Sequence, residues 1–244
     1  MAAAEAEAAA GEQFDRLGLK AGVWSAAQRG EARVLCRELG TGLARVLAFL
    51  PHGVAEPNWD LWARIFQWFG PAVGGGPWRL VWYAAATPRT FPVVGQDLGP
   101  EHVNGGYTRP CSTEGIYIYR AEEATRVLVH ELLHAACLDE EGWSIPEREA
   151  QIEVWAELFL VAVVARGSVR AAAPLWVKQA HWVADVNWKA EQAHGTRDIS
   201  DYAWRYLKGR EQMYARLGVP IPAARPAVAR QIQSLRFTHP ALGA

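Results

Sequence analysis

The chain has 244 residues, of which 50% are hydrophobic, and its formal net charge at pH 7 is −1. This composition can form the core of one large or two small domains without stabilising disulfides or metal ions. The balanced charge gives no indication of a basic surface for binding nucleic acid. The longest apolar run, residues 158–165, is far shorter than the roughly 20 residues that a membrane-spanning helix needs. We therefore expect a folded protein without a membrane span.

The N-terminal residues and the cysteines bear on location. Residues 1–10 lack the basic start and apolar centre of a signal peptide and have the composition of a low-complexity leader. Cys36, Cys111 and Cys137 are an odd number without metal-type spacing, so we expect reduced thiols and a cytoplasmic location.

The first predicted segment is helical. Apolar residues over about 11–48, the later ones at three- and four-residue spacings, predict helical structure, with breaks near Gly22 and Gly30. Gly40 and Gly42 argue against an unbroken helix.

The next elements are a helix, a strand and a loop. Residues 58–69 are predicted to form a helix that is capped by Asn58 and ended by Gly70. Residues 78–83 are rich in aromatic and branched side chains and predict a strand. Several Pro and Gly residues predict a loop over 84–102.

A hairpin is predicted before the central helix. Residues 116–119 (Ile-Tyr-Ile-Tyr) alternate aliphatic and aromatic side chains, as a short strand does. Residues 104–109 are its predicted partner strand.

The most informative motif, His130-Glu131-Leu132-Leu133-His134, lies in a predicted helix over 121–138. Histidines four residues apart share one helix face and can bind one tetrahedral metal ion. Glu131 lies about 100° around the helix, where it can reach a water on the metal. A chance match has a probability of roughly two in a hundred. The alternative interpretation is two satisfied histidines on a half-buried helix.

A second helix is predicted from a capping box at Ser144 and Glu147 to about Arg166. Catalytic zinc usually has three protein ligands. Three acids recur every four residues on one face of this helix and are the candidates for the third ligand: Glu149, Glu153 and Glu157. Such a stripe can be a solvated face, but the helix is apolar nearly all round from Trp155, and a carboxylate on a core helix must be paired or bind metal.

This arrangement of motif helix and glutamate-bearing helix resembles the gluzincin branch of zinc peptidases, whose thermolysin-like members take their third ligand from the next helix. The resemblance implies Glu153, nineteen residues after His134, as that ligand, and Glu157 as the acid that holds the N–H of His130. Glu149 and Glu157 remain alternative ligands. Metzincins have a third histidine shortly after the motif, and this chain has none at that distance from His134.

A narrower resemblance covers roughly residues 100–165. The segments 103–108 and 115–120, followed by the motif helix and by 153–156 (Glu-Val-Trp-Ala), are similar to putative metallopeptidases of large nucleocytoplasmic DNA viruses. The segment 202–206 (Tyr-Ala-Trp-Arg-Tyr) resembles a downstream segment of the same proteins. It makes Tyr202 the first choice for stabilising an oxyanion, ahead of Tyr206, His181 and His194. The resemblance also implies association with the virion.

Zinc peptidases of this type often present a strand above the metal, to which substrate adds as a further strand. The predicted substrate strand lies within 104–120, with Gly115, Ile116, Tyr117 and Ile118 as its candidate residues. An ordinary hairpin covering the helix is the alternative.

The last third is predicted to be helical. Helices are expected over 174–192, 199–216 and 226–236, followed by a loose tail at 238–244.

We predict an α+β, mostly helical, zincin-like fold with a small antiparallel sheet or hairpin beside the active-site helix. One domain over 11–237 is expected, with an N-terminal part at 11–100, a metal-site core at 101–166 and a C-terminal part at 167–237. Its predicted function is zinc-dependent hydrolysis of a peptide or protein substrate through a metal-activated water, with Glu131 as general base. The rival hypothesis is a non-catalytic interaction or virion component stabilised by zinc. The sequence leaves the oligomeric state open.

Overall fold

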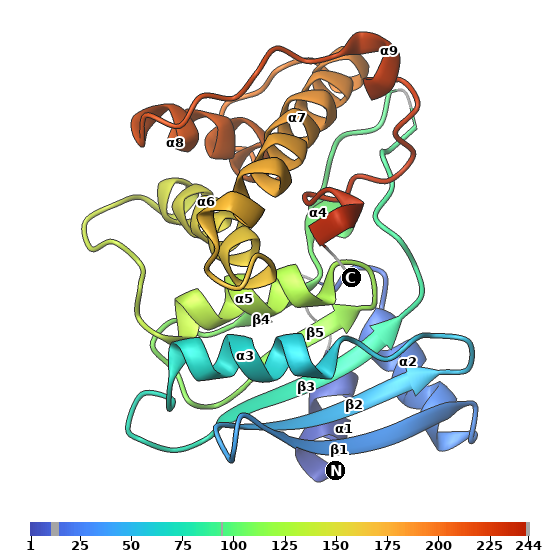
Figure 1. Cartoon of the computed structure of the whole chain (residues 1–244). Helices are drawn as coiled ribbons and strands as arrows, with labels where there is room; N and C mark the ends of the chain where they lie inside the picture. The colour runs from blue at the N-terminus through green and yellow to red at the C-terminus, as the bar shows by residue number, and fades with distance from the viewer. Residues whose placement is uncertain (11–14, 94, 243–244) are drawn as a thin grey trace. The chain divides into compact units, whose positions relative to one another are not determined.

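The structure is a computed structural model that describes residues 1–10, 15–93 and 95–242 (Figure 1). The fold is α+β with 47% helix and 14% strand, so helix predominates as predicted. The chain divides into two compact units: a first unit of Met1–Pro88 and Asn104–Leu138, and a second unit of Arg89–Val103 and Asp139–Ala244. These boundaries differ from those of the three parts expected from the sequence.

The first unit contains a five-stranded sheet in the order β1-β2-β3-β5-β4. Its strands are β1 (Ala32–Leu39), β2 (Ala44–Pro51), β3 (Trp78–Ala85), β4 (Gly106–Thr108) and β5 (Ile116–Arg120). The two outer pairs are antiparallel, whereas β2–β3 and β3–β5 are parallel. The predicted hairpin β4–β5 and the predicted strand β3 are confirmed, but the sheet is mixed and larger than expected. Parallel pairs require crossover connections, which no local pattern reveals.

The N-terminal prediction is wrong over residues 32–48, where the chain forms the hairpin β1–β2 instead of a helix. Only α2 (Leu19–Gln28) is helical between residues 15 and 51; it ends just before Gly30, as predicted, but runs through Gly22 without a break. Gly40 and Gly42, both with positive φ, turn the chain between the strands. Residues 11–14 of the predicted helix lie outside the described residues.

The low-complexity N-terminal segment packs against the sheet. It forms α1 (Ala2–Ala9), which buries Ala4 and Ala8 against aromatic residues of the sheet. The Tyr83 hydroxyl donates to the carbonyl of Ala4 (2.5 Å), and Lys20 of α2 forms an ion pair with Glu7 (2.8 Å).

Helices cover both faces of the sheet (Figure 1). On one face α2 covers the stacked rings of Phe49 and Tyr83, and on the other the ring of Trp82 packs against Trp62 of α3 (Trp59–Phe69). Alternate strand residues point to opposite faces, so a strand covered on both sides is hydrophobic throughout. Asn58 caps α3 as predicted, accepting from the backbone N–H of Leu61 (3.0 Å).

The motif helix α5 (Ala124–Ala135) lies on the same face as α3 and is joined to it by a hydrogen bond from Trp62 Nε1 to Thr125 Oγ1 (2.9 Å). It begins three residues later than predicted. Glu123 has φ of 60°, which is incompatible with a helical turn at that position.

The second unit is helical. Its long helices are α6 (Ile145–Val164) and α7 (Val169–His194), and the capping box of Ser144 and Glu147 begins α6 as predicted. Its shorter elements are α4 (Pro100–Val103), the π-helical turn η1 (Arg205–Gly209), α8 (Arg210–Arg216), α9 (Pro226–Ala229) and η2 (Pro240–Leu242).

Three C-terminal predictions need correction. The helix predicted over 199–216 begins at Arg205 with a π-helical turn, and the last predicted helix shortens to four residues. The tail is packed rather than loose, because Thr238 is buried and Leu242 joins the cluster around Leu160. Residues 243–244 of the predicted tail lie outside the described residues.

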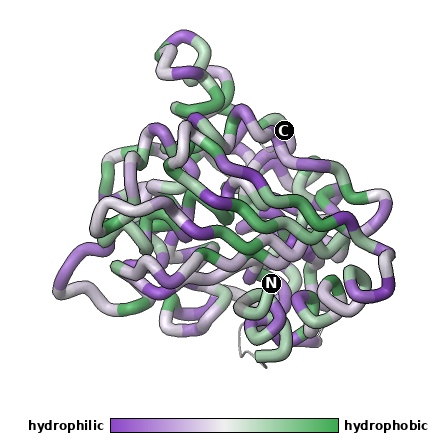
Figure 2. Tube along the Cα trace, turned by 90° about the horizontal axis from the view of Figure 1, so that it is seen from below, coloured by the Kyte–Doolittle hydropathy of each residue, from purple (hydrophilic) through white to green (hydrophobic). Residues whose placement is uncertain are grey.

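Hydropathy follows this organisation. Figure 2 shows hydrophobic stretches along the strands of the sheet. Within the described part of the chain, no helix has the length and apolar character that crossing a membrane requires.

Candidate metal centre

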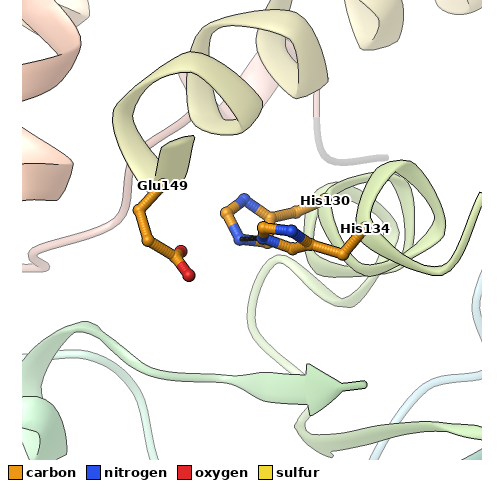
Figure 3. A group of neighbouring side chains, drawn as sticks. All are labelled: His130, His134 and Glu149. Carbon is orange, nitrogen blue, oxygen red and sulfur yellow. Dashed lines mark hydrogen bonds between the residues drawn. The ribbon is translucent and has the colours of Figure 1, made fainter. Parts of the chain in front are cut away.

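The two motif histidines present their ring nitrogens to one another. His130 and His134 lie one turn apart on α5, and both are buried. Their Nε2 atoms are 3.3 Å apart, as the dashed line in Figure 3 marks. Two nitrogens bound at 2.0–2.1 Å to one tetrahedral zinc ion are about 3.3–3.4 Å apart. The spacing of the rings therefore matches that of two imidazole ligands on one ion.

Glu131 follows His130 on the same buried helix and is itself buried. Its position about 100° around the helix sets it beside the histidine face rather than on it. The predicted role of Glu131 as general base stays a prediction.

One group of three residues in the described part of the chain combines side chains that could hold a metal ion: His130, His134 and Glu149. Their ligand atoms all lie within 4.8 Å of one another, and Figure 3 shows Glu149 extending from α6 towards the two rings. Two histidines and a glutamate are a ligand set of catalytic zinc sites.

Glu149 has a hydrogen-bond donor in its own unit. Tyr206, in η1, donates from its hydroxyl to Glu149 Oε2 (2.9 Å). Burial, followed by the charge of Glu149, raises the pKa of Tyr206 well above its usual value. The hydroxyl therefore keeps its proton at neutral pH and remains a donor. The sequence named Tyr206 only as an oxyanion candidate, and no spacing rule connects residues 149 and 206.

Glu153, the ligand favoured by the family resemblance, lies one turn beyond Glu149 on α6 and is fully buried. It does not belong to the group formed by His130, His134 and Glu149. The group contains Glu149, which the sequence analysis kept as an alternative ligand, and the assignment of Glu153 stays a prediction.

Glu157 lies in a buried polar network. Its Oε1 accepts from Arg210 Nη1 (2.5 Å) and its Oε2 from the hydroxyl of Tyr214 (2.6 Å). Burial raises the pKa of the Glu157 carboxyl, and the guanidinium of Arg210 opposes that shift. Both oxygens thus have partners that pack α6 against α8. The predicted support of His130 by Glu157 stays a prediction.

The predicted substrate strand needs correction. Residues Ile116, Tyr117 and Ile118 lie in β5, which is hydrogen-bonded to β3 on one side and β4 on the other. A strand paired on both sides cannot accept a further strand, and Gly115 precedes the element. The edge strand is β4, within the wider predicted range 104–120.

The edge strand lies close to the motif helix because residue 106 is a glycine. A Cβ at Gly106 would stand 2.6 Å from Cγ1 of Val127 and 2.7 Å from the carbonyl oxygen of Tyr117. Only a residue without a side chain allows this approach. Sequence reasoning did not single out Gly106.

Tyr202 lies beside Tyr206, with ring centroids 5.7 Å apart, and the guanidinium of Arg205 is 4.7 Å from the centre of its ring. Its predicted contribution to oxyanion stabilisation stays a prediction.

The expectation of reduced thiols is wrong for two of the three cysteines. Cys111, in the loop between β4 and β5, forms a disulfide with Cys137, just after α5, whereas Cys36 is free and exposed. Both bonded cysteines also donate their backbone N–H to the carbonyl of His134, at 3.0 and 3.1 Å. The two cysteines are 26 residues apart, and only the fold of the hairpin loop onto the helix end brings them together.

No family model, curated protein or solved structure matches the chain. The likeness to zinc peptidases therefore depends on the motif and on the geometry of the described residues.

Proposed function

We propose that the protein is a zinc-dependent metallopeptidase with His130, His134 and Glu149 as its metal ligands. The observation that carries the proposal is the 3.3 Å separation of the two Nε2 atoms on one buried helix face. An isolated pair of buried imidazoles can share one hydrogen bond, but that alone does not explain a carboxylate whose ligand atom lies within 4.8 Å of both. A divalent ion accounts for all three groups.

The donor set fits zinc, since imidazole nitrogen and carboxylate oxygen are among its usual ligands. When bound, Zn²⁺ supplies a Lewis acid that activates water and polarises the scissile carbonyl. Three protein ligands leave room for that chemistry, whereas a structural site is closed by four.

The chain's own residues supply the proton transfers and the substrate alignment. Glu131 takes a proton from the attacking water and passes it to the leaving amine, the work of a general acid–base group. The peptide adds to the edge strand β4 through main-chain hydrogen bonds, which give affinity with little sequence preference. The substrate class is therefore an extended peptide segment.

The test separates metal binding from turnover. Glu131→Gln is expected to retain one equivalent of zinc and to lose peptide hydrolysis, because the ligands remain and the base is gone. His134→Ala is expected to lose both. Metal content is measured by atomic absorption and turnover on a fluorogenic peptide library. Hydrolysis by Glu131→Gln at the rate of the unmodified protein would refute the mechanism, and zinc without any hydrolysis in the unmodified protein would favour a structural zinc site.

A further inference from the structure

We propose that Tyr206 is a positioning residue that fixes the carboxylate of Glu149 in the orientation needed to bind the metal. This inference rests on the proposed metal site, and it adds a residue that neither the motif nor the ligand set contains. The direct observation is the hydrogen bond from the Tyr206 hydroxyl to Glu149 Oε2 at 2.9 Å.

The tyrosine is held rigidly. Its side chain is 8% exposed, and its ring stacks on Phe237 with centroids 6.2 Å apart and an interplanar angle of 26°. The ring of Tyr202 packs beside it. Tyrosine has only two side-chain torsions, so this packing determines where the hydroxyl lies. The hydroxyl in turn limits the rotation of the longer glutamate side chain.

The backbone that carries Tyr206 has an unusual geometry. Residues Arg205–Gly209 form a π-helical turn. This conformation is rare in proteins, and where it occurs it is often at a functional site. The turn lies directly against α6: a Cβ at Gly209 would stand 3.0 Å from the Cβ of Ala150, the residue that follows Glu149. The widened turn and the glycine together set Tyr206 at hydrogen-bonding distance from the acid.

Groups that hold a metal ligand from outside the coordination sphere have a known effect. They orient the ligand and tune its basicity, and their mutation typically lowers metal affinity about 10- to 100-fold. Tyr206→Phe removes the hydroxyl and retains the ring. We therefore expect zinc to bind about 10- to 100-fold more weakly to the full chain of this variant, with the packing of the second unit unchanged.

The matched control is Tyr214→Phe. Tyr214 is also a buried tyrosine that donates to a glutamate of α6, but its acceptor, Glu157, is outside the group of three possible ligands. The control should lose stability and retain zinc affinity. An equal loss of zinc affinity in both variants would overturn the inference, because it would show that any disturbance of α6 weakens the metal.

The measurement uses Zn²⁺ alone in competition with a chromophoric chelator, and the visible absorption of the Co²⁺-loaded protein as a second readout. The absorption bands of Co²⁺ should shift in Tyr206→Phe and stay unchanged in Tyr214→Phe. In a double-mutant cycle, Tyr206→Phe should add no further loss to Glu149→Ala. Full zinc affinity in Tyr206→Phe, or independent losses in the cycle, would overturn the positioning role.

These outcomes are distinct from failure of the proposed function. If the unmodified protein binds zinc and cleaves no peptide, the peptidase is refuted while the role of Tyr206 is still decided by affinity. If the unmodified protein binds no zinc, both proposals are refuted.

Discussion

At the scale of single residues, the three acids of α6 show how much surroundings decide the role of a carboxylate. Glu149 accepts from a tyrosine hydroxyl and lies in the possible ligand group, whereas Glu157 is enclosed by Arg210 and Tyr214. Equal spacing in sequence predicts one shared face but not the partner that each position meets. The candidate ligand Glu149 and the structural acid Glu157 are therefore distinguished by partners more than fifty positions away in the sequence.

The ion pair between Arg210 and Glu157 is expected to be the most sensitive charge contact of the second unit. Both side chains are fully buried, so removing the cation leaves a carboxyl that must be desolvated alone or protonated. Arg210→Met should lower the free energy of unfolding by about 3–5 kcal/mol, measured by urea denaturation.

The control for this prediction is Arg216→Met, which removes a surface pair with Glu147 at 3.3 Å. Solvent screens such a pair, so no measurable change is expected. Comparable losses in the two variants would show that burial does not determine the strength of these contacts.

The motif residues were the most predictable part of the molecule. His130, Glu131 and His134 depend only on helix geometry, which is local, and the structure has the expected helix there. The contact between Glu149 and Tyr206 could not be predicted, because it depends on a π-helical turn. The propensity of a short segment does not encode that turn.

At the scale of elements, the position of the edge strand relative to the motif helix depends on one glycine. Gly106→Ala would place a methyl group within 2.7 Å of both the helix and the next strand, so β4 must move away from α5. We expect a loss of about 1–3 kcal/mol in the free energy of unfolding, the usual effect of overpacking. Denaturant unfolding measures it.

The control is Gly22→Ala in α2, where an added Cβ meets no atom within 4 Å. Alanine favours the helix over glycine, so this change should stabilise the protein by up to about 1 kcal/mol. Opposite signs for the two variants are the expected result. A stabilising effect of Gly106→Ala would contradict the close approach.

Elements were predicted correctly where local signals were strong and wrongly where pairing between strands overrode a helical spacing. The Asn58 cap and the capping box at Ser144 began their helices as expected. The segment 32–51 carries apolar residues at spacings that fit a helix. Pairing along the whole of β1 and β2 decided in favour of the hairpin.

At the scale of the whole molecule, the chain passes between the two units at three points: after residues 88, 103 and 138. A single-chain pattern of helices and strands does not show that residues 89–103 leave the first unit and that residue 104 returns to it. The mixed sheet was not predicted for the same reason. The parallel neighbours β3 and β5 are separated in the sequence by residues 89–103, which belong to the second unit.

Arg120, at the end of β5, forms hydrogen bonds where the chain leaves the first unit after residue 88 and where it returns at residue 104. Its guanidinium donates to the carbonyl oxygens of Asn104 (2.8 Å), Thr87 (2.9 Å) and Pro88 (3.0 Å). Arg120 is buried and its bond to Asn104 is shielded from water, whereas Thr87 and Pro88 are exposed residues. One side chain thus joins the segment that leaves the unit to the segment that re-enters it.

Replacing this arginine should loosen both segments together. Arg120→Met removes the donor to the Asn104 carbonyl at a buried position, at a cost of about 1–3 kcal/mol, and also the donor to the carbonyls of the exposed residues Thr87 and Pro88. Amide hydrogen exchange should therefore accelerate in residues 84–88 and 104–108 and stay unchanged in α7, which lies wholly in the second unit. Arg109→Met, which removes an exposed pair with Glu114, should leave exchange at both segments as it was. The substitution removes all three hydrogen bonds of the guanidinium at once. Faster exchange in only one of the two segments would therefore contradict the conclusion that Arg120 stabilises both.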